Sequence, residues 1–317
     1  SFPTRRSSDL PRGRLVAVTG VSGSGKTTLV LETLIPALKA QAAGERLPGH
    51  VRWVDAEGIG RANLIDATPI GANVRSTVAT YADIHDELRR AFARTPEAKA
   101  AGYKAGAFSY NTGALRCPTC DGTGSISLDV QFLPDVEIIC PACRGSRYAE
   151  AASHIHREGK DGSLLTLPQL MDMSVDEALD ATVGLKKVQA RLQTLHDLGL
   201  GYLTLGEPTP ALSGGEAQRL KLASEMGRVQ DDAVFVFDEP TIGLHPLDVQ
   251  VLLSVFDGLV SKGATVIVIE HDLDLIRNAD YVIDMGPGGG DAGGQIVCAG
   301  TPADIAACPK SVTGRYL

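Results

Sequence analysis

The sequence has no long apolar run, no excess of basic residues, no glycine repeat and no sustained heptad pattern. Its apolar runs, such as residues 234–237 and 265–269, have the length of a strand and not of a membrane span, which excludes a membrane-embedded protein. The 35 glycines follow no period, which excludes a collagen-like chain. The 38 acidic residues outnumber the 30 basic ones and give a net charge of −8, so any contact with nucleic acid must come from a local basic patch.

The 317 residues, 44% of them hydrophobic, are enough for one large or two ordinary domains. The first ten residues, SFPTRRSSDL, have neither the apolar stretch nor the cleavage site of a signal peptide, so we expect the chain in the cytoplasm. This segment resembles the translation of a sequencing-library adapter. We therefore expect residues 1–10 to be a sequencing artefact and the fold to begin at residue 11.

Apolar strands alternate with helical stretches near both ends of the chain, which predicts a parallel sheet with helical crossovers and hence an α/β fold. The predicted strands are residues 15–19, 51–55, 233–237, 264–269 and 281–284, and helices follow the first, third and fourth of them. The glycine-dense stretch 286–294 lies between strands and opens no helix, which favours a turn over a phosphate loop.

The middle of the chain has a different texture, with helices predicted at 83–93 and 185–198 and a cysteine-containing segment between them. We predict that residues 81–211 form a helical domain inserted into the sheet domain. The two parts of the sheet domain are then residues 11–80 and 212–317.

A glycine-rich loop follows the first predicted strand and precedes a helix. Its sequence, GVSGSGKT over residues 20–27, satisfies G-x4-G-K-[ST] in the context that gives this motif its mechanism. Backbone N–H groups of such a loop surround phosphates, the Lys26 ammonium reaches the β- and γ-phosphates, and the Thr27 hydroxyl holds Mg²⁺. A chance glycine turn is the alternative. The predicted nucleotide-binding residues are Gly20, Ser22, Gly23, Ser24, Gly25, Lys26, Thr27 and Thr28.

Two acidic residues and a histidine follow later strands of the same predicted sheet. Asp238 ends the strand at 233–237 and is placed to bind Mg²⁺ at the carboxyl edge, where ligands of α/β sheets bind. Glu239 comes next and is predicted to orient or deprotonate the attacking water. His271 follows the strand at 264–269 and is predicted to contact the γ-phosphate. The alternatives are two solvated acids at a strand end and a histidine without a special role.

A second phosphate-binding element is predicted at residues 212–218, LSGGEAQ. Ser213, Gly214 and Gly215 precede a helix, whose exposed N-terminal amides attract anions. This element comes between the glycine-rich loop and the aspartate strand, and that order is the one found in ABC-type ATPases.

Four of the six cysteines form two pairs, Cys117 with Cys120 and Cys140 with Cys143. The spacing C-x2-C-x19-C-x2-C lies within the range of zinc sites, and four thiolates close a tetrahedral shell around Zn²⁺. We expect a structural metal because all four ligand positions are filled. A redox C-x-x-C pair is the alternative, and Cys298 and Cys308 are expected to be ordinary small residues.

The motifs together resemble the UvrA family of bacterial excinucleases, over about residues 11–317. The resemblance rests on VTGVSGSGKTTLV, FLPDV at 132–136, CPACRGSRY at 140–148, DEPTIGLHPLD at 238–248, IEHDLDLI at 269–276, ADYVIDMGPGGGDAGGQIV at 279–297 and the ending TGRYL. It corresponds to the second, C-terminal ATPase half of that two-module family. The implied fold is an ABC-type P-loop ATPase domain with an inserted helical domain that carries a four-cysteine zinc module.

The resemblance implies an ATPase that couples ATP hydrolysis to DNA binding and damage surveillance in nucleotide excision repair. In this family the LSGG element of one module covers ATP held by the phosphate loop of another. The implied cofactors are ATP, Mg²⁺ and Zn²⁺. The implied partners are DNA, a first ATPase module absent from this sequence, a second copy in a head-to-tail homodimer, and UvrB. No association with a membrane is expected. By itself the chain is expected to be weakly active.

The sequence departs from the family at residue 67, where Ala67 replaces the glutamine that UvrA proteins usually carry in the segment resembling 65–71. An alanine cannot ligate Mg²⁺, so coupling between ATP and the inserted domain is expected to change. This difference leaves open a shorter UvrA-like relative that protects DNA from intercalating antibiotics. The strands that precede the phosphate loop in the family are also absent.

Two other protein classes share single features with the sequence. A transporter nucleotide-binding subunit would share the ATPase motifs, but the long segment between Lys26 and Ser213 contains a four-cysteine module that such subunits lack. A DnaJ-type cochaperone would share CPTCDGTG at 117–124, but it leaves the phosphate loop unexplained.

A basic cluster follows the second cysteine pair. Arg144, Arg147, Arg157 and Lys160 are predicted to contact DNA, and a solvated polar face is the alternative.

Overall fold

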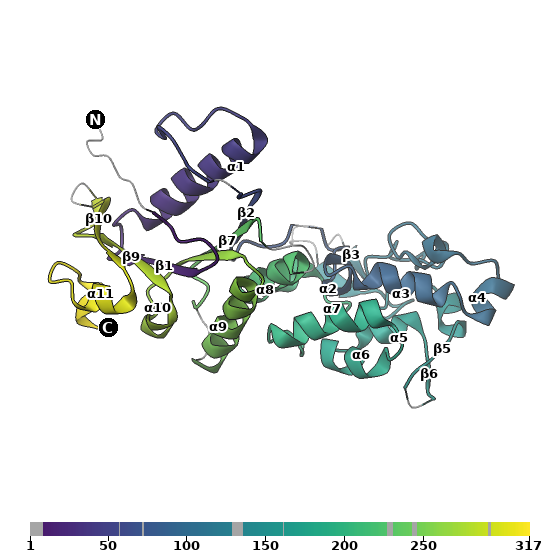
Figure 1. The fold of residues 1–317 in the computed structure, drawn as a ribbon. Helices are drawn as coiled ribbons and strands as arrows, with labels where there is room; N and C mark the ends of the chain where they lie inside the picture. Colours follow the sequence, from purple (N-terminus) through teal and green to yellow (C-terminus); the bar gives the residue numbers. More distant parts are fainter. Residues whose placement is uncertain are drawn as a thin grey trace. The chain divides into compact units, whose positions relative to one another are not determined.

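The computed structural model describes residues 9–317 except 57, 72, 129–135, 161, 227–230, 243–245 and 291–292 (Figure 1). Residues 1–8 of the adapter-like segment and residues 132–135 of the FLPDV stretch lie outside the described residues. The same holds for 243–245 in the stretch after Glu239 and for 291–292 in the glycine-dense turn. In the described part of the chain, no helix combines the length and the apolar character needed to cross a membrane.

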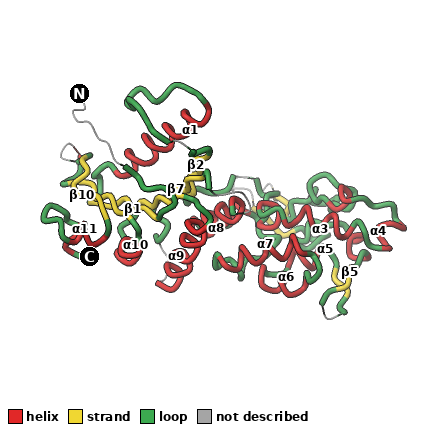
Figure 2. The backbone as a smooth tube through the Cα atoms, in the orientation of Figure 1, coloured by secondary structure: helices red, strands yellow, loops and turns green. Residues whose placement is uncertain are grey.

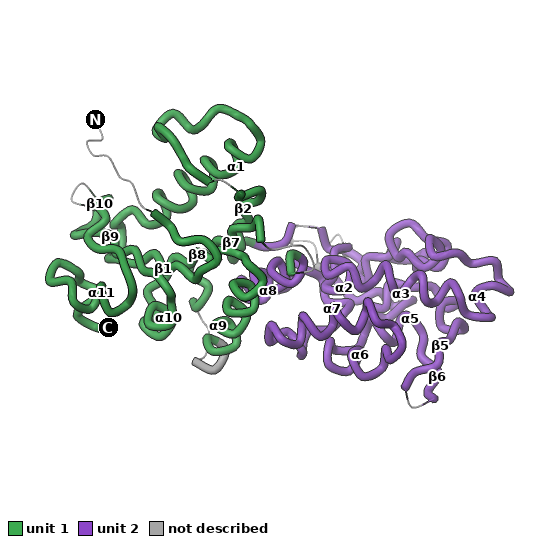
Figure 3. Tube along the Cα trace, viewed as in Figure 1, with its two compact units in different colours: residues 1–68, 225–317 green, residues 69–224 purple. Residues whose placement is uncertain are grey.

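The chain divides into two compact units, coloured separately in Figure 3. The first unit joins residues 1–68 to residues 225–317, and the second comprises residues 69–224. Helix α8 (Gly214–Glu225), which follows the LSGG element, falls in the second unit apart from its last residue.

The first unit is built on a six-stranded sheet in the order β10-β9-β1-β8-β7-β2. Its strands are yellow in Figure 2. All neighbours run parallel except β10, which pairs antiparallel with β9. Parallel strands covered on both faces are expected to be apolar throughout, and β1, β7 and β8 are almost entirely buried. The strands are β1 (Leu15–Gly20), β2 (Arg61–Ile65), β7 (Ala233–Asp238), β8 (Thr265–Ile269), β9 (Tyr281–Gly286) and β10 (Gln295–Gly300).

Helices cover the two faces of this sheet. Val234 and Val236 of β7 share a core with Val30 and Leu38 of the helical segment after the phosphate loop. Phe237 packs instead against Phe256 of α9, with ring centroids 4.7 Å apart, because successive strand residues point to opposite faces. The helical elements are the π-helical η1 (Thr28–Leu34), α1 (Ile35–Ala43), α9 (Pro246–Ser261), α10 (Leu273–Asn278), α11 (Pro302–Ala306) and the 3₁₀ turn η6 (Thr313–Arg315).

The strand predicted at residues 51–55 is wrong. These residues form an irregular loop in which Trp53 is 68% exposed, and the strand is β2, six residues further on. Both segments alternate in polarity, so the sequence pattern does not separate them. Pairing separates them, because Ala62 and Leu64 of β2 lie in register with Val234 and Val236 of β7.

The second unit is mainly helical and contains two small hairpins. Helix α3 buries Ile84, Leu88 and Phe92, which are spaced four residues apart and so share one face. The helices are α2 (Val78–Tyr81), α3 (Ile84–Phe92), α4 (Pro96–Ala100), α5 (Leu167–Asp172), α6 (Val175–Ala181), α7 (Lys186–Asp197) and α8, with 3₁₀ turns η2 (Ala105–Phe108), η3 (Glu150–His154) and η4 (Thr209–Ala211). The hairpins are β3 (Ser125–Leu128) with β4 (Val136–Ile139), and β5 (Arg157–Glu158) with β6 (Leu164–Leu165).

Candidate functional site

The glycine-rich loop leaves the carboxyl end of the central strand β1. Gly20 has φ +132°, and a Cβ there would lie 2.0 Å from the carbonyl oxygen of Met285, so no larger residue fits. Gly23 and Gly25 also have positive φ values, of +73° and +93°. These conformations let the chain turn back on itself at the start of a helix, as a phosphate-binding loop requires.

Two polar side chains in this loop are buried. The Lys26 ammonium donates to the carbonyl oxygens of Gly20 and Val21, at 3.0 and 3.1 Å. Burial lowers the pKa of Lys26, and the carboxylates of Glu239, Asp238 and Asp284 act in the opposite direction. Ser24 Oγ is buried and has no hydrogen-bond partner among the described residues. A buried hydroxyl without a partner beside a lysine fits a loop that accommodates phosphate oxygens.

The glycine-dense turn between β9 and β10 is hydrogen-bonded to the backbone of the phosphate loop, a role that its sequence did not indicate. The amides of Gly290 and Gly294 donate to the carbonyls of Gly23 and Ser24, at 3.2 and 2.8 Å. A Cβ on Gly289 would lie 2.9 Å from the carbonyl oxygen of Ser22. The density of glycine is thus explained by close backbone contact with the phosphate loop.

Acidic residues gather at the carboxyl ends of β2 and β7. Burial raises the pKa of Asp238, and the carboxylates of Glu239, Asp66 and Glu270 raise it further, while Lys26 lowers it. Carboxylate oxygens close to a phosphate-binding loop are the ligands that Mg²⁺ prefers. The sequence reasoning missed Asp66, although it directly precedes Ala67. Its Oδ1 accepts the amide and the hydroxyl of Thr68.

Glu239 and His271 come from neighbouring strands and face each other. His271 Nε2 lies 3.7 Å from Glu239 Oε1, and both side chains remain partly exposed. Glu239 has φ +46°, which is uncommon for a residue other than glycine, and its amide donates to the carbonyl of Ile269 at 2.9 Å. The structure therefore brings together at one sheet edge the lysine, the two acids and the histidine that the sequence singles out, while Thr27 and Thr28 are exposed in the first helical turn.

The LSGG element lies in the second unit and is ordered by reciprocal hydrogen bonds. The Ser213 amide donates to Glu216 Oε2 at 2.6 Å, and the Glu216 amide lies 3.4 Å from Ser213 Oγ, as in a capping box. Tyr202 donates its hydroxyl proton to Glu216 Oε1 at 2.5 Å. Burial raises the pKa of Tyr202 to about 12, with Glu216 acting in the same direction. Gly214 and Gly215 thus begin α8 with their backbone held in place.

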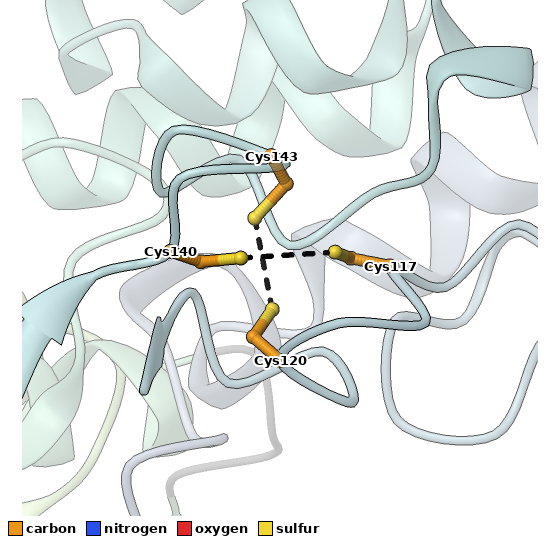
Figure 4. A group of neighbouring side chains, drawn as sticks. All are labelled: Cys117, Cys120, Cys140 and Cys143. Atoms are coloured by element: carbon orange, nitrogen blue, oxygen red, sulfur yellow. Dashed lines mark hydrogen bonds between the residues drawn. The ribbon is translucent and has the colours of Figure 1, made fainter. Parts of the chain in front are cut away.

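The four paired cysteines converge on one point (Figure 4). Their sulfur atoms all lie within 4.8 Å of one another, with 4.0 Å between Cys117 and Cys140 and 3.6 Å between Cys120 and Cys143. A zinc ion with Zn–S bonds of 2.3 Å in a tetrahedron requires sulfur atoms about 3.8 Å apart. The donor set and its spacing fit Zn²⁺.

The two cysteine turns have the same backbone geometry. Asp121 and Gly122 after the first pair, and Arg144 and Gly145 after the second, have positive φ values between +51° and +90°. This conformation directs amides at sulfur, and Gly124 N donates to Cys120 Sγ at 3.3 Å. Burial alone would raise the pKa of Cys120, but the Gly124 amide and the neighbouring thiols bring it to about 7. Amide donors toward thiolate sulfur are the support that a metal-bound cysteine needs.

The basic cluster predicted after the second cysteine pair is wrong in one member. Arg147 is buried, donates to the carbonyl of Val74 at 3.0 Å and lies over the Tyr110 ring at 5.3 Å, so it cannot contact DNA. Arg144 and Lys160 are exposed, and Arg157 is half-buried.

The second unit contains another group of basic residues, which the sequence reasoning missed. Arg90, Arg94, Lys99 and Lys104 are exposed and line a cavity of about 460 Å³ beside Tyr103.

Nearly the whole chain aligns in sequence with proteins of one kind. It is 47% identical over 310 residues to UvrABC system protein A of Mycobacterium tuberculosis (strain CDC 1551 / Oshkosh), and 46% identical over 312 residues to that of Aquifex aeolicus (strain VF5). These alignments cover 97% and 98% of this chain but 31% and 33% of those proteins. The chain therefore spans about a third of the length of these relatives. No protein-family model matches it.

A solved structure agrees with the sequence comparison. UvrA2 from Deinococcus radiodurans superposes with a TM-score of 0.88 at 43% identity, and the match covers 97% of this chain and 37% of that one. The fold is thus that of an ABC-type P-loop ATPase with an inserted helical domain that carries a four-cysteine cluster. Over nearly all of its length the chain is homologous to proteins of the UvrA family, and it corresponds to about a third of the length of those proteins.

Proposed function

We propose that the chain is an ATP-hydrolysing, DNA-binding part of a nucleotide excision repair protein of the UvrA type, equivalent to the second ATPase module. The observation that supports this most directly is the meeting of Lys26, Asp238, Glu239 and His271 at the carboxyl edge of one sheet. The homology to UvrABC system protein A over 97% of the chain supports the same assignment.

Each of these residues has a definite task in phosphoryl transfer to water. When bound, Mg²⁺ would neutralise charge on the β- and γ-phosphates. Asp238 and the Thr27 hydroxyl would hold that ion, and Lys26 would exchange its carbonyl partners for phosphate oxygens. Glu239 would orient the attacking water and accept its proton, and His271 would donate to the γ-phosphate. Ser213 and Gly214 would bind the γ-phosphate of a second module, as the resemblance to ABC-type ATPases implies.

The partner of the second unit is proposed to be DNA. The unit's exposed cations Arg94, Lys99 and Lys104 stand close together on a chain whose net charge is negative, and phosphate contacts need such a local basic patch. Zinc is proposed to fix the two cysteine turns and, through Arg147, the segment near Val74.

The experiment that tests the ATPase compares three forms of the full chain. Glu239→Gln is expected to retain ATP affinity and to lose most turnover, since positioned base catalysis contributes about 10²–10⁴-fold. Lys26→Ala is expected to weaken ATP binding itself. Binding of a fluorescent ATP analogue and phosphate release separate the two effects. Normal turnover by Glu239→Gln would contradict the proposed role of this residue.

DNA binding is tested separately by reversing charge. Arg94→Glu, Lys99→Glu and Lys104→Glu together are expected to lower DNA affinity and to reduce the slope of log K against log salt by about three, if each cation meets a phosphate. The matched control reverses Arg46, Lys262 and Lys310, three exposed cations of the first unit. Equal losses in the two triple variants would mean that net charge alone matters and would exclude a specific patch.

A further inference from the structure

Glu270 is a buried acid with no assigned role. It follows the last residue of β8 and precedes His271, and only 2% of its surface is exposed. Its own amide continues the sheet by donating to the carbonyl of Val18 at 3.1 Å. A carboxylate in such a position is stable only if its oxygens are well supplied with hydrogen-bond donors.

Glu270 receives four donors, two on each oxygen. Oε1 accepts the amide of Thr241 at 2.8 Å and also the Thr241 hydroxyl. Oε2 accepts the amides of His271 and Asp272, at 2.7 and 3.1 Å. One carboxylate thus ties together the segments that leave β7 and β8, which carry Glu239 and His271.

The segment on the β7 side is in a conformation that needs support. Glu239 has φ +46°, and its carbonyl accepts the amide of Ile242 at 3.3 Å in a tight turn. Such a backbone persists only where the surroundings determine it. The fixed points are the bond from the Glu239 amide to Ile269 and the two bonds from Thr241 to Glu270.

We infer that Glu270 is a positioning residue for ATP hydrolysis, which holds Glu239 and His271 in their mutual placement without touching the substrate. The 3.7 Å separation of Glu239 Oε1 and His271 Nε2 then depends on the hydrogen bonds by which Glu270 joins the two segments. This inference rests on the proposed ATPase function. Glutamine cannot replace Glu270, because its NH₂ group would face two donors in place of an acceptor.

The test uses the full chain at a concentration at which the unchanged chain hydrolyses ATP. Glu270→Gln is expected to lower kcat by about 10- to 100-fold, the range expected for a misplacement of the order of 1 Å, with KM for ATP changed less than about two-fold. Thr241→Val removes only the hydroxyl donor and is expected to lower kcat less. Thr241→Ser restores the hydroxyl and is expected to recover most of kcat.

The hydrogen exchange of the Thr241, His271 and Asp272 amides provides a second measurement. We expect these amides to exchange faster in Glu270→Gln, while the amides of β1 keep their protection. The positioning role would be overturned if Glu270→Gln raised KM and left kcat unchanged. Equal kcat values for Thr241→Val and Thr241→Ser would also overturn it. If Glu270→Gln does not fold, the Thr241 pair still decides.

Failure of this inference differs from failure of the ATPase proposal. A chain that hydrolyses ATP, loses turnover in Glu239→Gln and keeps it in Glu270→Gln would overturn the positioning role alone. An unchanged chain that neither binds nor hydrolyses ATP would contradict the proposed function and, with it, the role of Glu270.

Discussion

His85 is a neutral histidine enclosed by other side chains of the second unit. Its Nε2 lies 2.7 Å from the hydroxyl of Tyr148, which in turn donates to the carbonyl of Phe108 at 3.1 Å. Because the Tyr148 proton is used in this way, His85 Nε2 must be the donor to Tyr148, which fixes the tautomer. Burial lowers the pKa of His85 to about 3, and the positive charge of Arg89 acts in the same direction.

This shift predicts acid sensitivity of the second unit. Below pH 6.5 the unfolded chain takes up a proton on His85 while the folded chain does not, so stability is full above pH 6.5 and is lost as the pH falls toward 3. The loss from this residue is about 1.4 kcal/mol per pH unit. We expect the free energy of unfolding of the unchanged chain to fall more steeply between pH 6.5 and 5 than that of His85→Gln. Parallel pH profiles would contradict this prediction, because they would show that His85 takes up its proton at the same pH in the folded and the unfolded chain. Zinc release at low pH is expected to affect both proteins alike, so that it does not change this comparison.

Among single residues, the grouping of those in contiguous motifs could be predicted from the sequence, whereas contacts between distant residues could not. Lys26, Asp238 and Glu239 stand in short motifs, and the structure places them close together at one sheet edge. The contacts of Glu270 do not follow from the sequence, because its donor Thr241 lies 29 positions earlier and only the sheet brings the two residues together. The prediction for Arg147 is wrong because cationic residues usually face solvent, whereas here the guanidinium lies over an aromatic ring and donates to a backbone carbonyl.

At the scale of elements, the two cysteine turns are predicted to bind a single zinc ion together. Cys140→Ser removes one of four ligands and is expected to lower zinc affinity by at least about 100-fold, since even the loss of an outer-shell partner costs 10- to 100-fold. Zinc titration with a chromophoric chelator measures this. The amides of Gly124 and Cys140, which help to hold the turns, should exchange faster in this variant.

The control for this prediction is Cys298→Ser, which changes a thiol of the first unit. It is expected to leave zinc content at one per chain. The sheet of the first unit should keep its exchange protection in Cys140→Ser, because the cluster and that sheet belong to different compact units. Global unfolding of Cys140→Ser would contradict this independence.

The strands of the sheet show where sequence reasoning about elements succeeds and where it stops. Strands β1, β7 and β8 are continuous apolar runs, because they are buried on both faces, and such runs are easily recognised. The outer strand β2 is only partly buried and its sequence, RANLI, is less apolar. An irregular loop with two valines around Trp53 therefore gives a pattern as strand-like as that of β2, and only pairing with β7 identifies the strand.

At the scale of the whole molecule, the phosphate loop and the LSGG element belong to different compact units of the chain. In ABC-type ATPases, which the chain resembles, the LSGG element of one module completes the ATP site of another. We propose that the same holds here, so that two chains in a head-to-tail dimer would form two equivalent sites. Turnover per chain is then expected to be very low in dilute solution and to rise steeply with protein concentration.

Mixing two inactive variants tests this arrangement directly. Lys26→Ala inactivates the phosphate loop and Ser213→Arg blocks the facing element, so each protein alone is expected to be inactive. In a mixed dimer one site combines both defects, while the other joins an unchanged Lys26 to an unchanged Ser213. Half of the dimers in an equal mixture are mixed, and each has one intact site, so the mixture should recover about a quarter of the activity of the unchanged protein. If a single chain completed its own site, both sites of every mixture would stay defective. No recovery, together with concentration-independent turnover by a monomer of the unchanged chain, would therefore rule out the composite site.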